Sequence, residues 1–258
     1  MQKFYFDGAT FSYTAFGDHD NTELPVIVWA HGWGQSHQSF QYFFAPFEHS
    51  ARHIALDFPG FGHSQEPPEH WGTAQYADAI AAWLKKENFP AVVWIGHSFG
   101  CRVGTQLAAR HPEYLRAMVY IAGAGLKRPR PLYKSLYLFL RIRLFKALRR
   151  LVPKGTLKKA IMSYFGSADY NHTSGVMRQI FVRVVNENLA EEAQKIACPV
   201  ALIYGSEDTE TPPELGKTYA RLIKKSELHI LEGQDHYSVL STGRHRVIKI
   251  INDVLKHL

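Results

Sequence analysis

Short apolar runs alternate with longer segments of helical periodicity along most of the chain. Residues 25–30 (PVIVWA) and 91–96 (AVVWIG) are continuous apolar runs, typical of strands buried on both faces of a sheet. Residues 73–87, in contrast, begin at a threonine suited to N-capping and carry apolar side chains at helical spacing. The same criteria predict further strands at 4–6, 10–16, 53–58, 117–123, 199–205 and 227–233, and further helices at 101–111 and 246–258.

Strands that alternate with helices in this way predict an α/β fold. Right-handed βαβ connections place parallel strands side by side and put helices on both faces. We therefore expect a mostly parallel eight-stranded sheet flanked by helices, built from residues 1–124 and 191–258. About seventy-five residues separate the sixth predicted strand from the seventh, and they are helical in pattern. Residues 125–190 are thus predicted to form a helical cap inserted after strand six.

One serine stands at the end of a predicted strand, where open α/β sheets carry their reactive groups. Ser98 lies in GHSFG (96–100), between a strand and a helix, which is the setting of a nucleophile elbow. The pentapeptide alone arises by chance in about one chain in ten of this length at ordinary residue usage, so its context carries the argument. HGWG (31–34) follows an earlier strand, and the backbone N–H groups of Trp33 and Phe99 are the natural pair to hold an oxyanion.

A serine nucleophile needs a base within reach and a carboxylate that orients the base. Asp208 and His236 each follow a later predicted strand by a few residues. The order Ser98, Asp208, His236 is the one that accompanies a nucleophile elbow in this kind of sheet. Glu207 and Glu210 are rival carboxylates beside Asp208. A serine in an ordinary turn and a histidine on the surface are the structural alternatives for the other two residues.

Five motifs, in this order, resemble those of the α/β-hydrolase superfamily over nearly the whole chain: HGWG, DFPGFGHS, GHSFG, GSEDTETP and GQDHYS. The resemblance implies the α/β-hydrolase fold, a catalytic triad of Ser98, Asp208 and His236, and an oxyanion hole at Trp33 and Phe99. It implies hydrolysis of a small carboxylic ester through an acyl-enzyme, with no metal or organic cofactor. A C–C bond hydrolase, an amidase and a catalytically silent ligand-binding homologue share the fold and stay as alternatives.

Substrate contacts are predicted for further side chains near these motifs and in the cap. They are His31, His97, Leu136, Phe139 and Tyr237. The apolar cap positions favour an apolar acyl group. For His31 the alternative is that the ring braces the oxyanion loop, and for His97 that it packs beside its strand.

The charge of the chain is concentrated in one segment. The formal net charge is +7, from 30 Lys and Arg against 23 Asp and Glu, and residues 127–159 hold twelve of the basic residues and no acidic one. This amphipathic, aromatic segment is typical of a solvated helical face, of a surface for anionic lipid, or of a docking site for an acidic acyl carrier protein. HGWG and PGFG also resemble the pimeloyl-carrier-protein methyl ester esterases, whose basic cap receives such a carrier. Nucleic-acid binding is not expected, because no recognised motif accompanies the charge.

The sequence favours a cytoplasmic location. Cys101 and Cys198 form no disulfide framework and are expected to be reduced thiols. The N-terminal residues lack a basic region followed by an apolar run, and no apolar stretch approaches the roughly 20 residues that span a bilayer.

Overall fold

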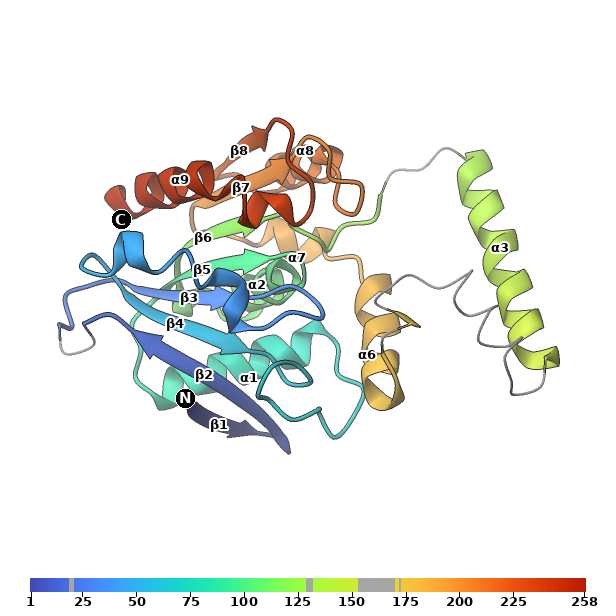
Figure 1. The fold of residues 1–258 in the computed structure, drawn as a ribbon, viewed down its shortest axis with the longest axis horizontal. Coiled ribbons are helices and arrows are strands. Elements are labelled where there is room, and N and C mark those ends of the chain that lie inside the picture. Colours follow the sequence, from blue (N-terminus) through green and yellow to red (C-terminus); the bar gives the residue numbers. More distant parts are fainter. Residues whose placement is uncertain (19–20, 129–131, 153–169, 172) are drawn as a thin grey trace.

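The computed structural model describes residues 1–18, 21–128, 132–152, 170–171 and 173–258 (Figure 1). Its centre is an eight-stranded sheet in the order β1-β2-β4-β3-β5-β6-β7-β8. The strands are β1 (Gln2–Phe6), β2 (Ala9–Phe16), β3 (Val26–Ala30), β4 (Arg52–Asp57), β5 (Val92–His97), β6 (Leu115–Ile121), β7 (Val200–Gly205) and β8 (Ser226–Leu231).

The sheet is mostly parallel, as the alternating pattern predicts. From β4 through β3, β5, β6 and β7 to β8 every neighbouring pair runs parallel. The antiparallel part is the amino-terminal hairpin: β1 pairs with β2 through a turn at Asp7 and Gly8, both with positive φ, and β2 pairs antiparallel with β4. The parallel strands therefore end along a single edge, where their following loops meet.

Helices cover both faces of the sheet. The α-helices are α1 (Thr73–Lys86), α2 (Phe99–Arg110), α3 (Leu132–Leu151), α6 (Gly175–Asn186), α7 (Ala190–Gln194), α8 (Pro213–Leu222) and α9 (Arg244–Lys256). Short 3₁₀ helices lie at η1 (His37–Phe40), η2 (Ala45–Phe47), η3 (Pro112–Tyr114) and η4 (Ser238–Leu240).

Strand β3 shows how the two apolar cores are built from one period-2 pattern. Val26, Val28 and Ala30 point into the core formed with α1, α2 and α8, whereas Ile27 and Trp29 point into the core formed with η1, η2 and α9. All five side chains are fully buried. Alternate residues of a strand face opposite sides, so a continuous apolar run fits a strand covered on both faces.

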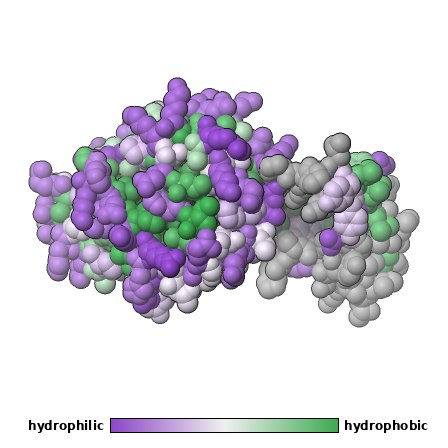
Figure 2. Space-filling view, turned by 90° about the horizontal axis from the view of Figure 1, so that it is seen from above, coloured by the Kyte–Doolittle hydropathy of each residue, from purple (hydrophilic) through white to green (hydrophobic). Residues whose placement is uncertain are grey.

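Between β6 and β7 the described chain contains helices α3, α6 and α7, and part of the cap predicted for residues 125–190 lies outside the described residues. Helix α6 packs on the body of the protein through buried Met177, Ile180 and Val184. Helix α3 stands apart from the sheet (Figure 1), and its predicted contact residues Leu136 and Phe139 are 59% and 52% exposed. Apolar side chains reach the surface at this end of the molecule (Figure 2). No helix in the described ranges is long and apolar enough to cross a bilayer.

Candidate active site

Ser98 stands in a strained turn between β5 and α2. Its backbone has φ of +47° and ψ of −100°, a region that L residues enter only when neighbours force them, at a cost of about 1–3 kcal/mol. The Ser98 N–H donates to the Ile121 carbonyl at 3.0 Å, and the Cys101 N–H donates to the Ser98 carbonyl at 3.1 Å. These two bonds fix the turn against β6 and the first turn of α2.

The flanking glycines are required by close backbone contacts. A Cβ at Gly100 would lie 2.0 Å from the Ala30 carbonyl oxygen at the end of β3, and one at Gly96 would lie 2.8 Å from the Cys101 nitrogen. The spacing of glycines around Ser98 thus lets α2 approach the sheet edge closely.

His236 and Asp208 form a buried hydrogen-bonded pair. His236 Nδ1 lies 2.8 Å from Asp208 Oδ2, and both residues are less than 5% exposed. Burial raises the pKa of the Asp208 carboxyl, but bonds from His236 and from Thr211 outweigh it and hold the pKa below its ordinary value. Asp208 is therefore ionised at neutral pH and fixes the orientation of the His236 ring.

Thr211 is a part of this arrangement that sequence reasoning missed. Its Oγ1 lies 2.8 Å from Asp208 Oδ2, 3.1 Å from His236 Nδ1 and 3.0 Å from the Ala122 carbonyl oxygen. Its N–H donates to Asp208 Oδ1 at 2.7 Å. A threonine three residues after an aspartate in a loop is a local turn signal that could have indicated this contact.

The rival carboxylates occupy different places. Glu207 is exposed, and its N–H donates to the Gln234 carbonyl at 2.9 Å. Glu210 Oε2 lies 3.5 Å from His236 Nε2, the ring nitrogen opposite the one bound by Asp208. Asp208 is thus the carboxylate on Nδ1, and Glu210 contributes negative charge on the other side of the ring.

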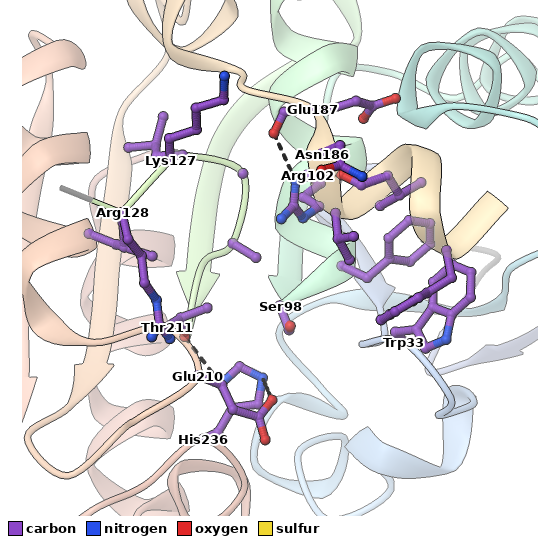
Figure 3. Close-up of a pocket in the computed structure, with 18 of the residues that line it drawn as sticks. Trp33, Ser98, Arg102, Lys127, Arg128, Asn186, Glu187, Glu210, Thr211 and His236 are labelled. Atoms are coloured by element: carbon purple, nitrogen blue, oxygen red, sulfur yellow. Dashed lines mark hydrogen bonds and ion pairs between the residues drawn. The ribbon is translucent and has the colours of Figure 1, made fainter. Parts of the chain in front are cut away.

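A cavity of about 660 Å³ brings the predicted residues together at the carboxyl edge of the sheet (Figure 3). Ser98, His236, Trp33, Phe99 and Tyr237 all line it. They come from the loops after β3, β5 and β8. The remaining lining residues are Arg102, Ala124, Gly125, Leu126, Lys127, Arg128, Phe181, Val184, Val185, Asn186, Glu187, Glu210, Thr211 and Leu215.

Trp33 and Phe99 lie together at the wall nearest to Ser98. Phe99 is the first residue of α2, so its N–H has no acceptor within the helix. The Trp33 ring packs edge-on against Phe99, with ring centroids 5.4 Å apart, and against Phe61 at 4.8 Å. The turn that carries Trp33 is held by a bond from the Gly32 N–H to Gln35 Oε1 at 2.9 Å.

The structure corrects the substrate contacts predicted for His31 and His97. Both rings are fully buried behind the cavity and do not line it. His31 donates from Nδ1 to the Gly32 carbonyl at 2.7 Å and accepts from the Phe58 N–H at Nε2 at 3.0 Å, and burial lowers its pKa to about 4. His97 Nε2 lies 3.0 Å from the His236 carbonyl oxygen, and burial lowers its pKa to about 3. Both histidines brace loops of the site instead.

The cap residues predicted to contact substrate are also placed elsewhere. Leu136 and Phe139 lie on the exposed helix α3 and are absent from the lining of the cavity. The apolar lining comes from α6 instead, through Phe181, Val184 and Val185. Helical periodicity identified the segment as helical but gave no register against the sheet.

One group of side chains in the described ranges is arranged like the ligands of a metal site, and the spacing of histidines in the sequence did not predict it. One potential ligand atom each from His37, Asp57 and His63 lies within 4.8 Å of the others. The Asp57 oxygens already accept the backbone N–H groups of His37 and His63 at 2.7 and 2.9 Å. Burial raises the pKa of Asp57, but these bonds outweigh it and keep the pKa below its ordinary value. The carboxylate thus ties two loops together, as expected for a loop-stabilising residue.

Comparisons with known proteins identify relatives of this chain in sequence and in fold. The sequence model of the "Alpha/beta hydrolase family" matches residues 27–250. A pimeloyl-[acyl-carrier protein] methyl ester esterase of Vibrio atlanticus is 25% identical over 84% of this chain and 90% of its own length. A 1-acylglycerol-3-phosphate O-acyltransferase of Arabidopsis thaliana is 31% identical over 39% of this chain, and the match spans about a quarter of that longer protein. The enol-lactonase of Burkholderia xenovorans LB400 shares the fold, with a TM-score of 0.75 at 18% identity, over 99% of this chain and all of that one.

The elbow glycine gives a first prediction. Gly100→Ala should lower the free energy of unfolding by about 3 kcal/mol or more, because the new Cβ meets a backbone oxygen that no rotamer can move. Gly175→Ala is the matched control: it has positive φ but open space around it, so it should cost only about 1 kcal/mol. Urea denaturation measures both. Equal losses would show that the contact with Ala30 does not constrain the elbow.

The buried histidine gives a second prediction. The unfolded chain takes up a proton at His31 near the ordinary pKa, whereas the folded protein does so only at about pH 4, so stability is lost as pH falls. This group should remove about 2 kcal/mol from the free energy of unfolding between pH 7 and pH 5. His31→Gln should reduce that pH dependence, measured by urea denaturation at both pH values. An unchanged slope would contradict the assignment.

Proposed function

The chain belongs to the alpha/beta hydrolase family, and we propose that it is a serine hydrolase that cleaves a carboxylic ester through an acyl-enzyme on Ser98. One observation carries the proposal. Ser98 stands on a strained elbow and faces the same cavity as His236, whose Nδ1 lies 2.8 Å from Asp208. Nucleophile, base and orienting carboxylate are the three groups that acyl transfer by a serine requires.

The reaction proceeds in two steps. His236 Nε2 takes the proton of Ser98 as Oγ attacks the ester carbonyl, and the oxyanion accepts hydrogen bonds from the Trp33 and Phe99 N–H groups. The alcohol leaves with the proton from His236, and a water molecule activated by the same nitrogen releases the acid. Asp208 stays ionised throughout because its hydrogen bonds lower its pKa. Glu210, 3.5 Å from Nε2, adds negative charge beside the imidazolium as it forms.

The cavity supports a small-molecule ester with an apolar part. Phe181, Val184 and Val185 of α6 and Leu215 of α8 supply apolar lining, and a volume of about 660 Å³ is in the usual range for small-ligand sites. We assign residues 1–124 and 191–258 to the hydrolase core, and 125–190 to a cap over the cavity. A cytoplasmic location is supported by both cysteines being free thiols.

A specific observation favours a second substrate form, an ester on an acyl chain held by an acidic carrier protein. The Vibrio atlanticus relative is named for such a substrate. Helix α3 contains no acidic residue, and its partly exposed Arg141 and exposed Arg143 present positive charge beside exposed Leu140 and Leu144. Such a surface complements an acidic partner and speeds its encounter.

Removal of the nucleophile tests the main proposal. Ser98→Ala should lower kcat/KM for short p-nitrophenyl esters by a factor of about a thousand or more and abolish labelling by a fluorophosphonate. Ser241→Ala, an exposed serine after η4, is the control that should keep both. Persistent labelling of the Ser98→Ala protein would exclude Ser98 as the nucleophile. Turnover of amides or diketones in place of esters would favour the other chemistries of this fold, and ligand binding without any turnover would favour a silent homologue.

Charge reversal tests the carrier substrate. Arg141→Glu combined with Arg143→Glu should lower kcat/KM for a carrier-linked methyl ester roughly tenfold at low salt, because attraction of the carrier is lost. Turnover of a free methyl ester should stay within about twofold of the unmodified protein. Equal loss on both substrates would contradict carrier docking at α3. If the unmodified protein binds vesicles of anionic lipid and the double variant does not, the surface of α3 would be assigned to membrane binding instead.

A further inference from the structure

Basic side chains line the cavity wall beside Ser98. Arg102 lies in the first turn of α2, and Ser98 is the residue immediately before that helix; both residues line the cavity. Lys127 and Arg128 reach the same cavity from the segment after β6 (Figure 3). The three residues therefore come from two separate elements and line one ligand-sized space.

Arg102 is held by neutral acceptors. Its Nη1 donates to the backbone carbonyl oxygens of Val184 at 2.9 Å and of Glu187 at 3.5 Å. Burial lowers the pKa of the guanidinium, because the charge is kept away from water. A cation in such a place is costly unless an anion compensates it.

The acidic residues of the cavity form no ion pair with Arg102. The Glu187 side chain binds the Thr73 backbone N–H at 3.1 Å and the Thr73 hydroxyl, and its charge raises the pKa of Arg102 without offsetting burial. Glu210 faces His236. Within the described ranges, no ion pair joins Arg102 or Lys127 to a carboxylate.

Lys127 and Arg128 are anchored through their own segment. The Lys127 backbone N–H donates to Asn188 Oδ1 at 3.2 Å, and Arg128 Nη2 donates to the Thr209 carbonyl oxygen. The first contact fixes the backbone of Lys127, an exposed residue in the lining of the cavity. Lys127 therefore contributes charge without an obvious part in holding the fold.

We propose that the ester cleaved at Ser98 carries an anionic group, a carboxylate or a phosphate, that Arg102 and Lys127 bind at the cavity wall. This inference rests on the proposed ester hydrolysis and adds the class of substrate. The anion adds negative charge beside Arg102, and its attraction positions the ester carbonyl at Ser98, which lines the same cavity. Arg102 and Lys127 are thus specificity residues that touch the substrate.

Matched substrates test the inference. Mono-p-nitrophenyl adipate and p-nitrophenyl hexanoate differ in the carboxylate at the end of the acyl chain. A third ester with a terminal phosphate distinguishes the two anions. The unmodified protein should show a kcat/KM at least about tenfold higher for one of the anionic esters than for the neutral one, because hydrogen bonds to charged groups are strong. The preference should shrink as ionic strength rises.

Variants connect the preference to the named residues. Lys127→Met should lower the anionic-to-neutral ratio of kcat/KM roughly tenfold, mainly through KM. Arg102→Met should remove most of the preference that remains. Lys195→Met, an exposed lysine before β7 at the opposite edge of the sheet, is the matched control and should leave the ratio unchanged. If Arg102→Met does not fold, the Lys127→Met variant and the salt dependence of the preference still test whether basic residues of the cavity bind the anion.

The outcomes separate this inference from the proposed function. Equal or better turnover of the neutral ester by the unmodified protein would overturn the anion site while ester hydrolysis stands. A preference that survives Lys127→Met and Arg102→Met would also overturn it. Failure to hydrolyse any ester would contradict the proposed function itself.

Discussion

The close approach of Gly100 to the Ala30 carbonyl determines the geometry of the site. No side chain fits between the two backbones, so α2 begins directly against the end of β3. The preceding Ser98 has positive φ and lines the cavity. The amino terminus of α2, whose first N–H groups have no acceptor within the helix, lies beside the turn that carries Trp33. The proposed nucleophile and the proposed oxyanion donors therefore both depend on how α2 begins.

Buried hydrogen bonds hold the other loops of the site in fixed positions relative to the elbow. His97, next to Ser98, reaches the His236 carbonyl oxygen, and Thr211 links Asp208 to the Ala122 carbonyl at the end of β6. His31 joins the turn after β3 to Phe58 after β4. Each contact bridges loops that follow different strands, and none of these rings or hydroxyls is exposed. The parallel sheet therefore sets the relative positions of groups that lie far apart in sequence.

Strands and the turn around Ser98 could be predicted because they depend on local sequence pattern. Apolar runs located the strands, because burial on both faces demands them, and GHSFG with its flanking strand and helix located the elbow. The order of motifs predicted Asp208 and His236 as partners, and the two side chains are hydrogen-bonded in the structure. Contacts that depend on three-dimensional neighbours were not predictable: Thr211 occupies an ordinary loop position, and His31 and His97 are read as possible substrate ligands until their burial is known. The helical period of residues 132–151 likewise carried no information on what α3 packs against, so the exposure of Leu136 and Phe139 could not be predicted.

Arg102 connects the site to the segment above it. Its guanidinium caps the carboxyl end of α6 through the carbonyl oxygens of Val184 and Glu187, where the helix dipole is negative. A guanidinium carries five N–H donors, so the groups other than Nη1 remain for a ligand anion. Ligand binding and the packing of α6 would then be two linked equilibria, in which each event changes the other by an equal free energy. One side chain would couple the occupation of the cavity to the stability of the helix that lines it.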